Sequence, residues 1–284
     1  MPIQVQPLPA TFGATISGVN LRELSAEEFQ TLHQLWLEYA LLIFPGQHLD
    51  NDEQTRFAER FGALEFPLTP ISNVRKDGSI RADNDADGVI QILKGNMGWH
   101  CDSTYMPVQA KGAVFTAHVV PKRGGETGWA DLRAGYDVLN AELKNRIDSL
   151  SAYHSLHHSQ AMAGFHPEKG GDYSGYGFHG NPPPLRPLVK YHPETGRPNL
   201  LIGRHAYGIP GLPANESEAL LRDLVEITCQ PPRVYHHHWQ AGDAVLWDNR
   251  CLLHRACPWD MTEPRVMYHA RIAGDPASEF AGTE

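Results

Sequence analysis

The spacing of apolar residues changes along the chain, from a helical period near the start to strand-like alternation further on. After Ser25 and Glu28, which have the spacing of a capping box, apolar residues recur every three or four positions and predict a helix. The run ALLIFPG then predicts a buried strand that ends in a Pro-Gly turn. A second helix is expected to follow, with Phe57, Ala58 and Phe61 on one face.

Short alternating segments dominate the rest of the chain and predict a mainly β protein with flanking helices. The predicted strands are Ala113 to Val120, Leu188 to Tyr191, Leu200 to Gly203, Ala244 to Trp247 and Val266 to Ile272. One helix is predicted to carry Tyr136, Leu139, Leu143 and Ile147, and another to carry Leu220, Leu221, Leu224 and Val225.

Two polar stretches interrupt this pattern. The Gly- and Asp-rich tract from Lys76 to Gly88 predicts a mobile loop, within an insertion that extends over 76–98. A second long loop is predicted for 164–187, which is rich in Gly, Pro and Tyr. The length of 284 residues suits one domain, which we expect to span 1–284.

Composition excludes several classes of partner. A formal net charge of −9 and a pI near 5.9 argue against nucleic acid, which requires clustered Lys and Arg. The N-terminal residues lack the features of a secretory signal, and the best apolar run, from Leu35 to Phe44, is interrupted by Glu38 and therefore predicts no membrane span. The four cysteines show no CxxC spacing and are expected to be reduced thiols in a cytoplasmic protein.

The 16 histidines make chance matches to any metal motif frequent. A search for His-x-Asp/Glu finds His48/Asp50, His100/Asp102, His166/Glu168 and His192/Glu194. Asp50 and Glu53 have the spacing of a helix cap, and the last two pairs lie in HPEKGG and HPETGRP, which are typical of turns. The triplet His236 to His238 and the pair His157 and His158 predict structural or solvated side chains, because neighbouring strand residues point to opposite faces.

His100 and Asp102, in GNMGWHCDSTY, are the remaining pair. On an extended backbone residues i and i+2 share a face, so both side chains could bind one metal ion, while Cys101 would point the other way. An ordinary polar pair at the end of a strand fits the same two residues, and a metal site requires a third ligand.

His254 supplies a candidate for that ligand, because it follows an apolar strand and an Asp-Asn turn in AVLWDNRCLLH. Two histidines and one carboxylate form the facial arrangement of non-haem Fe(II) oxygenases, which leaves coordination positions open. Zinc also fits these residue types, although a structural zinc site would require a fourth protein ligand.

Two arginines lie in or directly before the predicted strand 266–272. Arg265 lies eleven residues after His254, and in a regular strand Arg265, His269 and Arg271 share one face. Buried guanidinium groups are costly unless anions neutralise them, so this face suggests a site for carboxylates. A salt bridge at the surface is the alternative.

Taken together, these motifs resemble the taurine dioxygenase/2,4-D dioxygenase (TauD/TfdA) family of Fe(II)- and 2-oxoglutarate-dependent oxygenases. The resemblance is carried by FGATISGVNL, ALLIFPGQ, FAERFG, WHCD, GGETGWADLRAGYDVL, HPETGRP, WDNRCLLHRA and RIAGD. Within that family, GNMGWHCDSTYMPV, HPETGRPNLLIGRHA and WDNRCLLHRACPWD are most similar to the (S)-selective aryloxyalkanoate dioxygenases.

The resemblance implies a double-stranded β-helix, or jelly-roll, core of the cupin type with helices outside. It also implies that His100, Asp102 and His254 bind iron, and that Arg265 and Thr127 bind the distal carboxylate of 2-oxoglutarate. Substrate contacts are implied for Asn96 and for residues after Asp102, here Tyr105, Met106 and Val108.

The chain departs from the family pattern at two positions. Cys101 stands where relatives commonly have Thr or Ser, and His269 stands where many relatives have a second Arg that grips the substrate. Arg271 is then expected to help bind one of the two anions, either the co-substrate or the substrate, with His269 nearby.

The implied reaction uses O₂ to hydroxylate the carbon between the ether oxygen and the carboxylate of a phenoxyacetate or phenoxypropionate, such as 2,4-D or dichlorprop. The product collapses to a phenol plus glyoxylate or pyruvate, with succinate and CO₂ from 2-oxoglutarate. Candidate pocket walls in the 164–187 loop are Phe165, Tyr173, Tyr176 and Phe178.

Two alternatives stay open at this point. The chain could act on taurine or another alkyl sulfonate or sulfate, or it could be a cupin-like metal protein that binds a carboxylate without oxygenase chemistry. A small carboxylate ligand and a homo-oligomeric state are expected under the main hypothesis.

Overall fold

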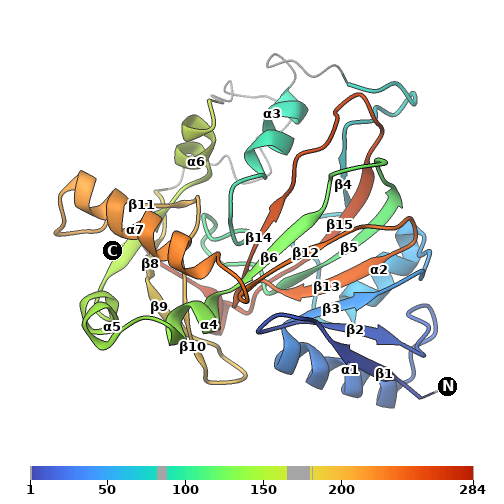
Figure 1. The fold of residues 1–284 in the computed structure, drawn as a ribbon, viewed down its shortest axis with the longest axis horizontal. Helices are drawn as coiled ribbons and strands as arrows, with labels where there is room; N and C mark the ends of the chain where they lie inside the picture. The colour runs from blue at the N-terminus through green and yellow to red at the C-terminus, as the bar shows by residue number, and fades with distance from the viewer. Residues whose placement is uncertain (1, 82–87, 165–179, 181, 284) are drawn as a thin grey trace.

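A computed structural model describes residues 2–81, 88–164, 180 and 182–283 of the chain. Its largest sheet has seven strands in the order β1-β2-β3-β13-β5-β15-β4 (Figure 1). These are β1 (Gln4–Pro7), β2 (Ala14–Ser17), β3 (Leu41–Phe44), β4 (Thr69–Ser72), β5 (Gly112–Val119), β13 (Ala244–Asp248) and β15 (Val266–Ile272). Among the described strands of this sheet, β2 and β3 pair in parallel and the other neighbours are antiparallel.

A second, three-stranded antiparallel sheet has the order β12-β6-β14. Its strands are β6 (Thr127–Asp131), β12 (Val234–His237) and β14 (Leu252–Ala256). Smaller sheets comprise β7 (Ser151–His154), β8 (Leu185–Pro187) and β11 (Ala206–Tyr207), and β9 (Val189–Tyr191) with β10 (Pro198–Leu200). The large sheet and the β12-β6-β14 sheet form the two layers of the predicted jelly-roll core.

Strand alternation divides the apolar residues of the large sheet between two cores. Leu42 and Phe44 of β3 belong to a cluster shared with helices, whereas Leu41 and Ile43 belong to a second cluster. That second cluster also contains Trp129 of β6 and Leu252 of β14, so it fills the space between the two sheets. Leu41 and Ile43, which alternate along β3 with Leu42 and Phe44, therefore point into this interior.

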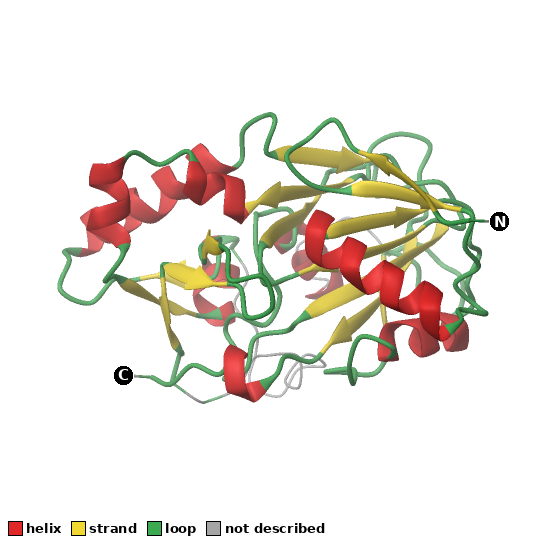
Figure 2. Ribbon diagram, turned by 90° about the horizontal axis from the view of Figure 1, so that it is seen from below, coloured by secondary structure: helices red, strands yellow, loops and turns green. Residues whose placement is uncertain are grey.

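Helices cover the outer faces of both sheets (Figures 1 and 2). The buried faces of α1 (Ala26–Tyr39) and α2 (Asn51–Glu59) pack on the large sheet, and α4 (Leu132–Asp137) and α7 (Ala214–Thr228) form part of the core outside the small sheet. The remaining helices are α3 (Gly88–Gly95), α5 (Ala141–Ile147), α6 (Leu156–Met162) and α8 (Pro276–Glu279). No described helix has the length and apolarity that a membrane crossing needs.

Both predicted capping boxes are confirmed. The Ser25 hydroxyl accepts a hydrogen bond from the main-chain N–H of Glu28 at the start of α1, and Asp50 does the same for Glu53 at the start of α2. Asp50 therefore acts as a helix cap, as its spacing predicted.

The single helix predicted to carry residues 136–147 is wrong. The chain forms two short helices there, and α4 ends at Asp137 before α5 begins at Ala141. The break has a local cause, because the Asn140 side chain accepts a hydrogen bond from the N–H of Leu143 at 2.8 Å and starts a new helix. Apolar spacing alone did not reveal that cap.

Two predicted loops and one predicted strand also differ from the structure. The prediction of a loop over 76–98 is wrong for its last part, where α3 occupies Gly88–Gly95. The loop predicted over 164–187 includes β8 at its end. The strand predicted from Leu200 to Gly203 stops at Leu200, and Gly203 has a φ of +128°, which a regular strand does not allow. Residues 82–87, 165–179 and 181 lie outside the described part.

Gln54 ties α2 to the large sheet. Its fully buried side-chain amide donates to the main-chain oxygens of Val114 and Tyr268, at 3.0 and 2.9 Å, and accepts from the Thr116 hydroxyl at 2.7 Å. One side chain therefore satisfies polar groups on both β5 and β15, the strands that lead into the candidate site described below.

Replacing Gln54 with Leu should lower the free energy of unfolding by about 2 to 4 kcal/mol, because partners of the lost amide stay buried without a hydrogen bond. Urea denaturation measures the change. Thr55→Ala on the same helix removes an exposed hydroxyl and should cost less than about 0.5 kcal/mol. Equal losses in both variants would contradict this role for Gln54.

Candidate active site

His100 and His254 are brought together by their main chains. The N–H of each residue donates to the carbonyl of the other, at 3.0 and 2.8 Å, in an isolated antiparallel bridge. Residues paired in this way place their side chains next to each other, and the two imidazole rings lie 4.2 Å apart between centroids. Two positions that are far apart in sequence thus form one site.

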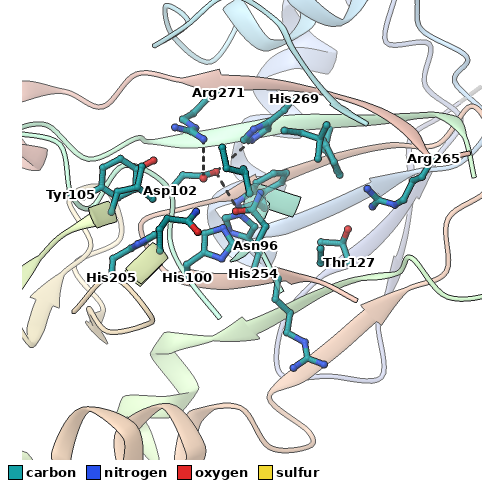
Figure 3. Close-up of a pocket in the computed structure, with 18 residues that line it drawn as sticks. Asn96, His100, Asp102, Tyr105, Thr127, His205, His254, Arg265, His269 and Arg271 are labelled. Atoms are coloured by element: carbon teal, nitrogen blue, oxygen red, sulfur yellow. Dashed lines mark ion pairs between the residues drawn. The ribbon is translucent and has the colours of Figure 1, made fainter. Parts of the chain in front are cut away.

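Asp102 completes a cluster with these histidines. Ligand atoms of His100, Asp102 and His254 all lie within 4.8 Å of one another, and all three side chains are buried. Figure 3 shows them at the centre of a cavity between the two sheets. The predicted i, i+2 geometry is present, and Cys101 points the other way, with its thiol near the Leu252 carbonyl.

The donor atoms fit a metal ion. The Nδ1 of His100 lies 2.7 Å from the Gly98 carbonyl, and donation of its N–H to that oxygen leaves Nε2 available as a ligand. The Oδ2 of Asp102 is buried without a hydrogen-bond partner and lies 3.6 Å from the Nε2 of His254. Two imidazoles and one carboxylate of this kind suit Fe(II).

The surroundings keep these candidate ligands in the protonation states that a metal needs. Burial lowers the pKa of His254 to about 4, so its imidazole is neutral at physiological pH. Burial alone would raise the pKa of Asp102, but Arg271 and the neighbouring histidines outweigh burial and hold that pKa well below its usual range. The site therefore offers neutral imidazoles and an ionised carboxylate.

Arg265 and Thr127 lie together at one end of the cavity (Figure 3). Arg265 is 2% exposed, its Nε donates to the Gly125 carbonyl at 3.2 Å, and burial lowers the pKa of its guanidinium to about 10. Within the described residues, no carboxylate forms an ion pair with Arg265. Thr127 accepts from the indole of Trp239 at 3.0 Å, so its own hydroxyl hydrogen is available for a ligand.

Arg271 differs from Arg265 because acidic groups already surround it. Its guanidinium lies 3.1 Å from the Oδ1 of Asp102 and 3.8 Å from the Oε2 of Glu65, and it donates to the Ser103 hydroxyl at 3.0 Å. Burial raises the pKa of Glu65, although Arg271 and Ser103 oppose that effect. His269, whose ring stacks on Trp247, lies 3.5 Å from the Oδ2 of Asp102.

The substrate residues expected from the sequence fall into three groups. Asn96, Tyr105, His269 and Arg271 line the cavity. Met106 and Val108 are not among its described lining residues; the Met106 carbonyl accepts a hydrogen bond from Arg186, and Val108 forms an isolated bridge with Phe280. The loop aromatics Phe165, Tyr173, Tyr176 and Phe178 lie outside the described residues.

The other histidine motifs have structural partners. His192 lies in the predicted turn, and its Nε2 is 3.0 Å from Asp248. Asp248 and Cys251 form a second cluster with His192, but both oxygens of the Asp248 carboxylate already accept from Arg250. His237 pairs with Asp243 and the exposed His238 with Glu126, as the structural or solvated interpretation of the triplet predicted. His166 and Glu168 lie outside the described residues.

Sequence reasoning missed several residues of the site. His205 lines the cavity beside Tyr105, and Leu156 and Gln160 reach the cavity from α6. Among 16 histidines, nothing in the sequence near His205 distinguishes it. Its position depends on the chain returning to the site between β10 and β11.

Asn249 was also missed, although it lies in the WDNR stretch. Its Oδ1 accepts from the main-chain N–H of Asp102 at 2.7 Å, and its Nδ2 donates to the carbonyls of Asp102 and Ala110, each at 2.9 Å. The fully buried amide therefore holds Asp102 through its main chain. The Asp-Asn turn before His254 thus positions a second candidate metal ligand.

Binding of Mn(II), a stable substitute for Fe(II), should change by less than about threefold between pH 8 and pH 6, and should weaken below about pH 5. Protons compete with the metal for His254 only as the pH approaches its pKa of about 4. Electron paramagnetic resonance of free Mn(II) measures the affinity, and His254→Ala should reduce it at every pH. A tenfold loss between pH 8 and pH 6 would contradict the buried, neutral site.

The whole chain is similar to proteins of known activity. Residues 4–271 match the family model described as "Taurine catabolism dioxygenase TauD, TfdA family". The chain is 62% identical over 278 residues to the (S)-phenoxypropionate/alpha-ketoglutarate-dioxygenase of Sphingobium herbicidovorans, covering 98% of this chain and 97% of that protein. A protein of the same name from Delftia acidovorans is 54% identical over 285 residues, with 98% of each chain covered.

Solved structures of similar proteins match the chain over nearly its whole length. The crystal structure of AAD-2 in complex with Mn(II) and N-oxalylglycine superimposes with a TM-score of 0.90 at 35% identity and covers 100% of both chains. A crystal structure described as a putative alpha-ketoglutarate dependent 2,4-D dioxygenase from Burkholderia xenovorans has a TM-score of 0.81 at 32% identity, covering 97% of this chain and 99% of that one. The jelly-roll prediction is confirmed by this likeness over the whole chain.

Proposed function

The chain belongs to the TauD/TfdA family of 2-oxoglutarate-dependent dioxygenases, and from this we propose that it hydroxylates aryloxyalkanoic acids, with (S)-phenoxypropionates as substrates. The observation that carries the proposal is the full-length similarity to two proteins named for that substrate, joined to a cavity with two buried cations beside the His-Asp-His cluster. Two buried cations suit a reaction in which co-substrate and substrate are both carboxylates.

The proposed ligands of the iron are His100, Asp102 and His254. Iron and 2-oxoglutarate, when bound, supply the oxidising power that inserts an oxygen atom from O₂ into a C–H bond. The chain's share is to keep both imidazoles neutral and the carboxylate ionised, which burial and Arg271 achieve. The apolar walls that Phe115 and Trp247 contribute exclude water around these groups.

We assign the distal carboxylate of 2-oxoglutarate to Arg265 and Thr127. A guanidinium that is buried without an ion-pair partner gains most from an anionic ligand, since Glu126 and the rings of Phe115 and Trp259 offset its desolvation only in part. The fork of N–H groups on Arg265 suits a carboxylate, and the hydroxyl of Thr127 can donate to the same group. N-oxalylglycine in the AAD-2 crystal structure is a dicarboxylic acid, which supports a dicarboxylate here.

The substrate carboxylate is assigned to the opposite side of the cluster, where Arg271 and His269 lie. Tyr105, Ile92 and Leu156 line the cavity and supply the apolar surface that an aryl ring requires. Hydroxylation between the ether oxygen and the carboxylate forms a hemiacetal or hemiketal. Loss of its hydroxyl proton, formation of a C=O bond and departure of the aryloxide then give a phenol plus glyoxylate or pyruvate.

Turnover should depend on the chemical class of the substrate and on its absolute configuration. With Fe(II), 2-oxoglutarate and O₂, we expect (S)-2-(2,4-dichlorophenoxy)propionate to give pyruvate, 2,4-dichlorophenol and succinate. Its (R) enantiomer should react with at least about tenfold lower kcat/KM, because an inverted centre turns a different group toward the metal. Phenol and succinate are measured by chromatography, with taurine and an alkyl sulfate as comparison substrates. Succinate formation stimulated by taurine alone would refute the substrate assignment.

Arg265→Gln should raise the KM for 2-oxoglutarate by about 30-fold or more, because a buried charge-assisted pair is lost. Thr127→Val should raise it by about three- to tenfold, since only one hydrogen bond is lost. Steady-state kinetics with varied 2-oxoglutarate measures both. Thr116→Val is the matched control, because Thr116 is a buried threonine of β5 whose hydroxyl bonds Gln54. An unchanged KM in Arg265→Gln would exclude Arg265 as the co-substrate anchor.

Three further expectations stay predictions. We propose that residues 1–284 form one dioxygenase domain, that the protein works in the cytoplasm and that it forms a homo-oligomer. Free thiols at all four cysteines support a reducing compartment, because none of the four is in a disulfide.

A further inference from the structure

The turn that follows Asp102 is held from outside the cavity. After the metal ligand the chain reverses, with the Met106 N–H donating to the Ser103 carbonyl at 3.0 Å and with Ser103 at a φ of +55°. This turn directs Tyr105 into the cavity and carries Ser103, which contacts Arg271 and Glu65. The shape of the turn therefore determines two features of the site at once.

Arg186 of β8 binds the outer side of this turn. Its Nε donates to the Thr104 carbonyl at 2.7 Å, and its Nη2 donates to the Met106 carbonyl at 2.7 Å. Its Nη1 donates to the Glu279 carbonyl at 3.1 Å in α8. The side chain is 2% exposed.

These contacts differ from an ordinary buried ion pair. The Glu279 carboxylate is bound by Lys190, so Arg186 directs its guanidinium to main-chain oxygens. A guanidinium is planar and its N–H groups have fixed directions, so the carbonyls that it binds must keep a fixed spacing. Lysine, with a single ammonium group, cannot impose that spacing.

Thr104 and Met106 flank Tyr105, and Thr104 is two residues from Asp102. A shift of either carbonyl therefore moves the metal carboxylate, the cavity wall formed by Tyr105, or both. In oxygenases of this chemistry a misplaced substrate allows 2-oxoglutarate to be consumed without product, because positioning of the C–H bond decides which group is oxidised.

We propose that Arg186 is a positioning residue of the dioxygenase reaction, which aligns Asp102 and Tyr105 by fixing the 103–106 turn and so couples 2-oxoglutarate consumption to substrate hydroxylation. The inference rests on the proposed function for its substrate. Arg186 itself touches neither the cavity nor the metal ligands, and it acts through main-chain carbonyls.

The test compares Arg186→Met and Arg186→Lys with the wild type. The control is Arg233→Met, because Arg233 is a part-buried arginine that donates to a main-chain carbonyl, that of Ile227, at the end of α7. Phenol and succinate are measured in the same reaction, together with the KM for each substrate. Mn(II) affinity is measured without substrate.

In Arg186→Met the ratio of phenol to succinate should fall by about threefold or more, and the KM for the phenoxypropionate should rise by about fivefold or more. The KM for 2-oxoglutarate should stay within about twofold, because Arg265 lies at the other end of the cavity. Mn(II) binding should weaken by about fivefold. Arg186→Lys should recover part of each loss, and Arg233→Met should change none of them.

A lower kcat in Arg186→Met with unchanged ratio, KM values and Mn(II) affinity would overturn the proposal, since that pattern is a loss of folded enzyme. If Arg186→Met fails to fold, the same measurements on Arg186→Lys decide. Failure of the proposed function is distinguishable, because the wild type would then form no phenol. Mn(II) affinity alone would decide in that case, and an unchanged affinity would overturn the role of Arg186.

Discussion

The main-chain pair between His100 and His254 is the contact on which the rest of the site depends. Two hydrogen bonds set these residues opposite each other, and strand geometry then places Asp102 on the same face as His100. Because the three candidate ligands come from two segments that meet at one bridge, the spacing of the proposed metal site is determined by backbone pairing. Asn249 reinforces that pairing, since it bonds both main-chain polar groups of Asp102 from the turn before His254.

The same interior holds two arginines whose electrostatic situations are opposite. Arg271 has Asp102 and Glu65 beside it, so its charge is largely balanced within the chain. Arg265 is equally buried and, among the described residues, has no ion pair. Aromatic rings and the Gly125 carbonyl stabilise this cation only in part, so a bound anion would recover as affinity much of the free energy lost on burying it. The imbalance thus explains why a chain of net charge −9 can bind small anions in its core.

Strand alternation in the sequence predicts much of this arrangement. The shared face of Arg265, His269 and Arg271 and the pairing of His100 with Asp102 both depend on a period of two, which local sequence reveals. The resemblance did not hold at Met106 and Val108, where the chain turns after Ser103, which adopts a left-handed conformation. His205 and Asn249 could not be predicted, since their contacts join segments that only the tertiary fold brings together. The break between α4 and α5 was missed because one capping side chain outweighed continuous apolar spacing.

The supports of the site share a physical feature, which is that they bind main chain in preference to side chains. Asn249 holds the Asp102 backbone from one side, and Arg186 holds the carbonyls of Thr104 and Met106 from the other. A carbonyl is present whatever side chain occupies the position, so the turn can keep its shape when residues 104 and 106 are replaced. The residues that donate have no such freedom, because an unpaired carbonyl in this interior costs about 1 to 3 kcal/mol. We therefore expect substitutions of Arg186 and Asn249 to be tolerated less well than substitutions of residues 104 and 106, although those two residues lie closer to Asp102.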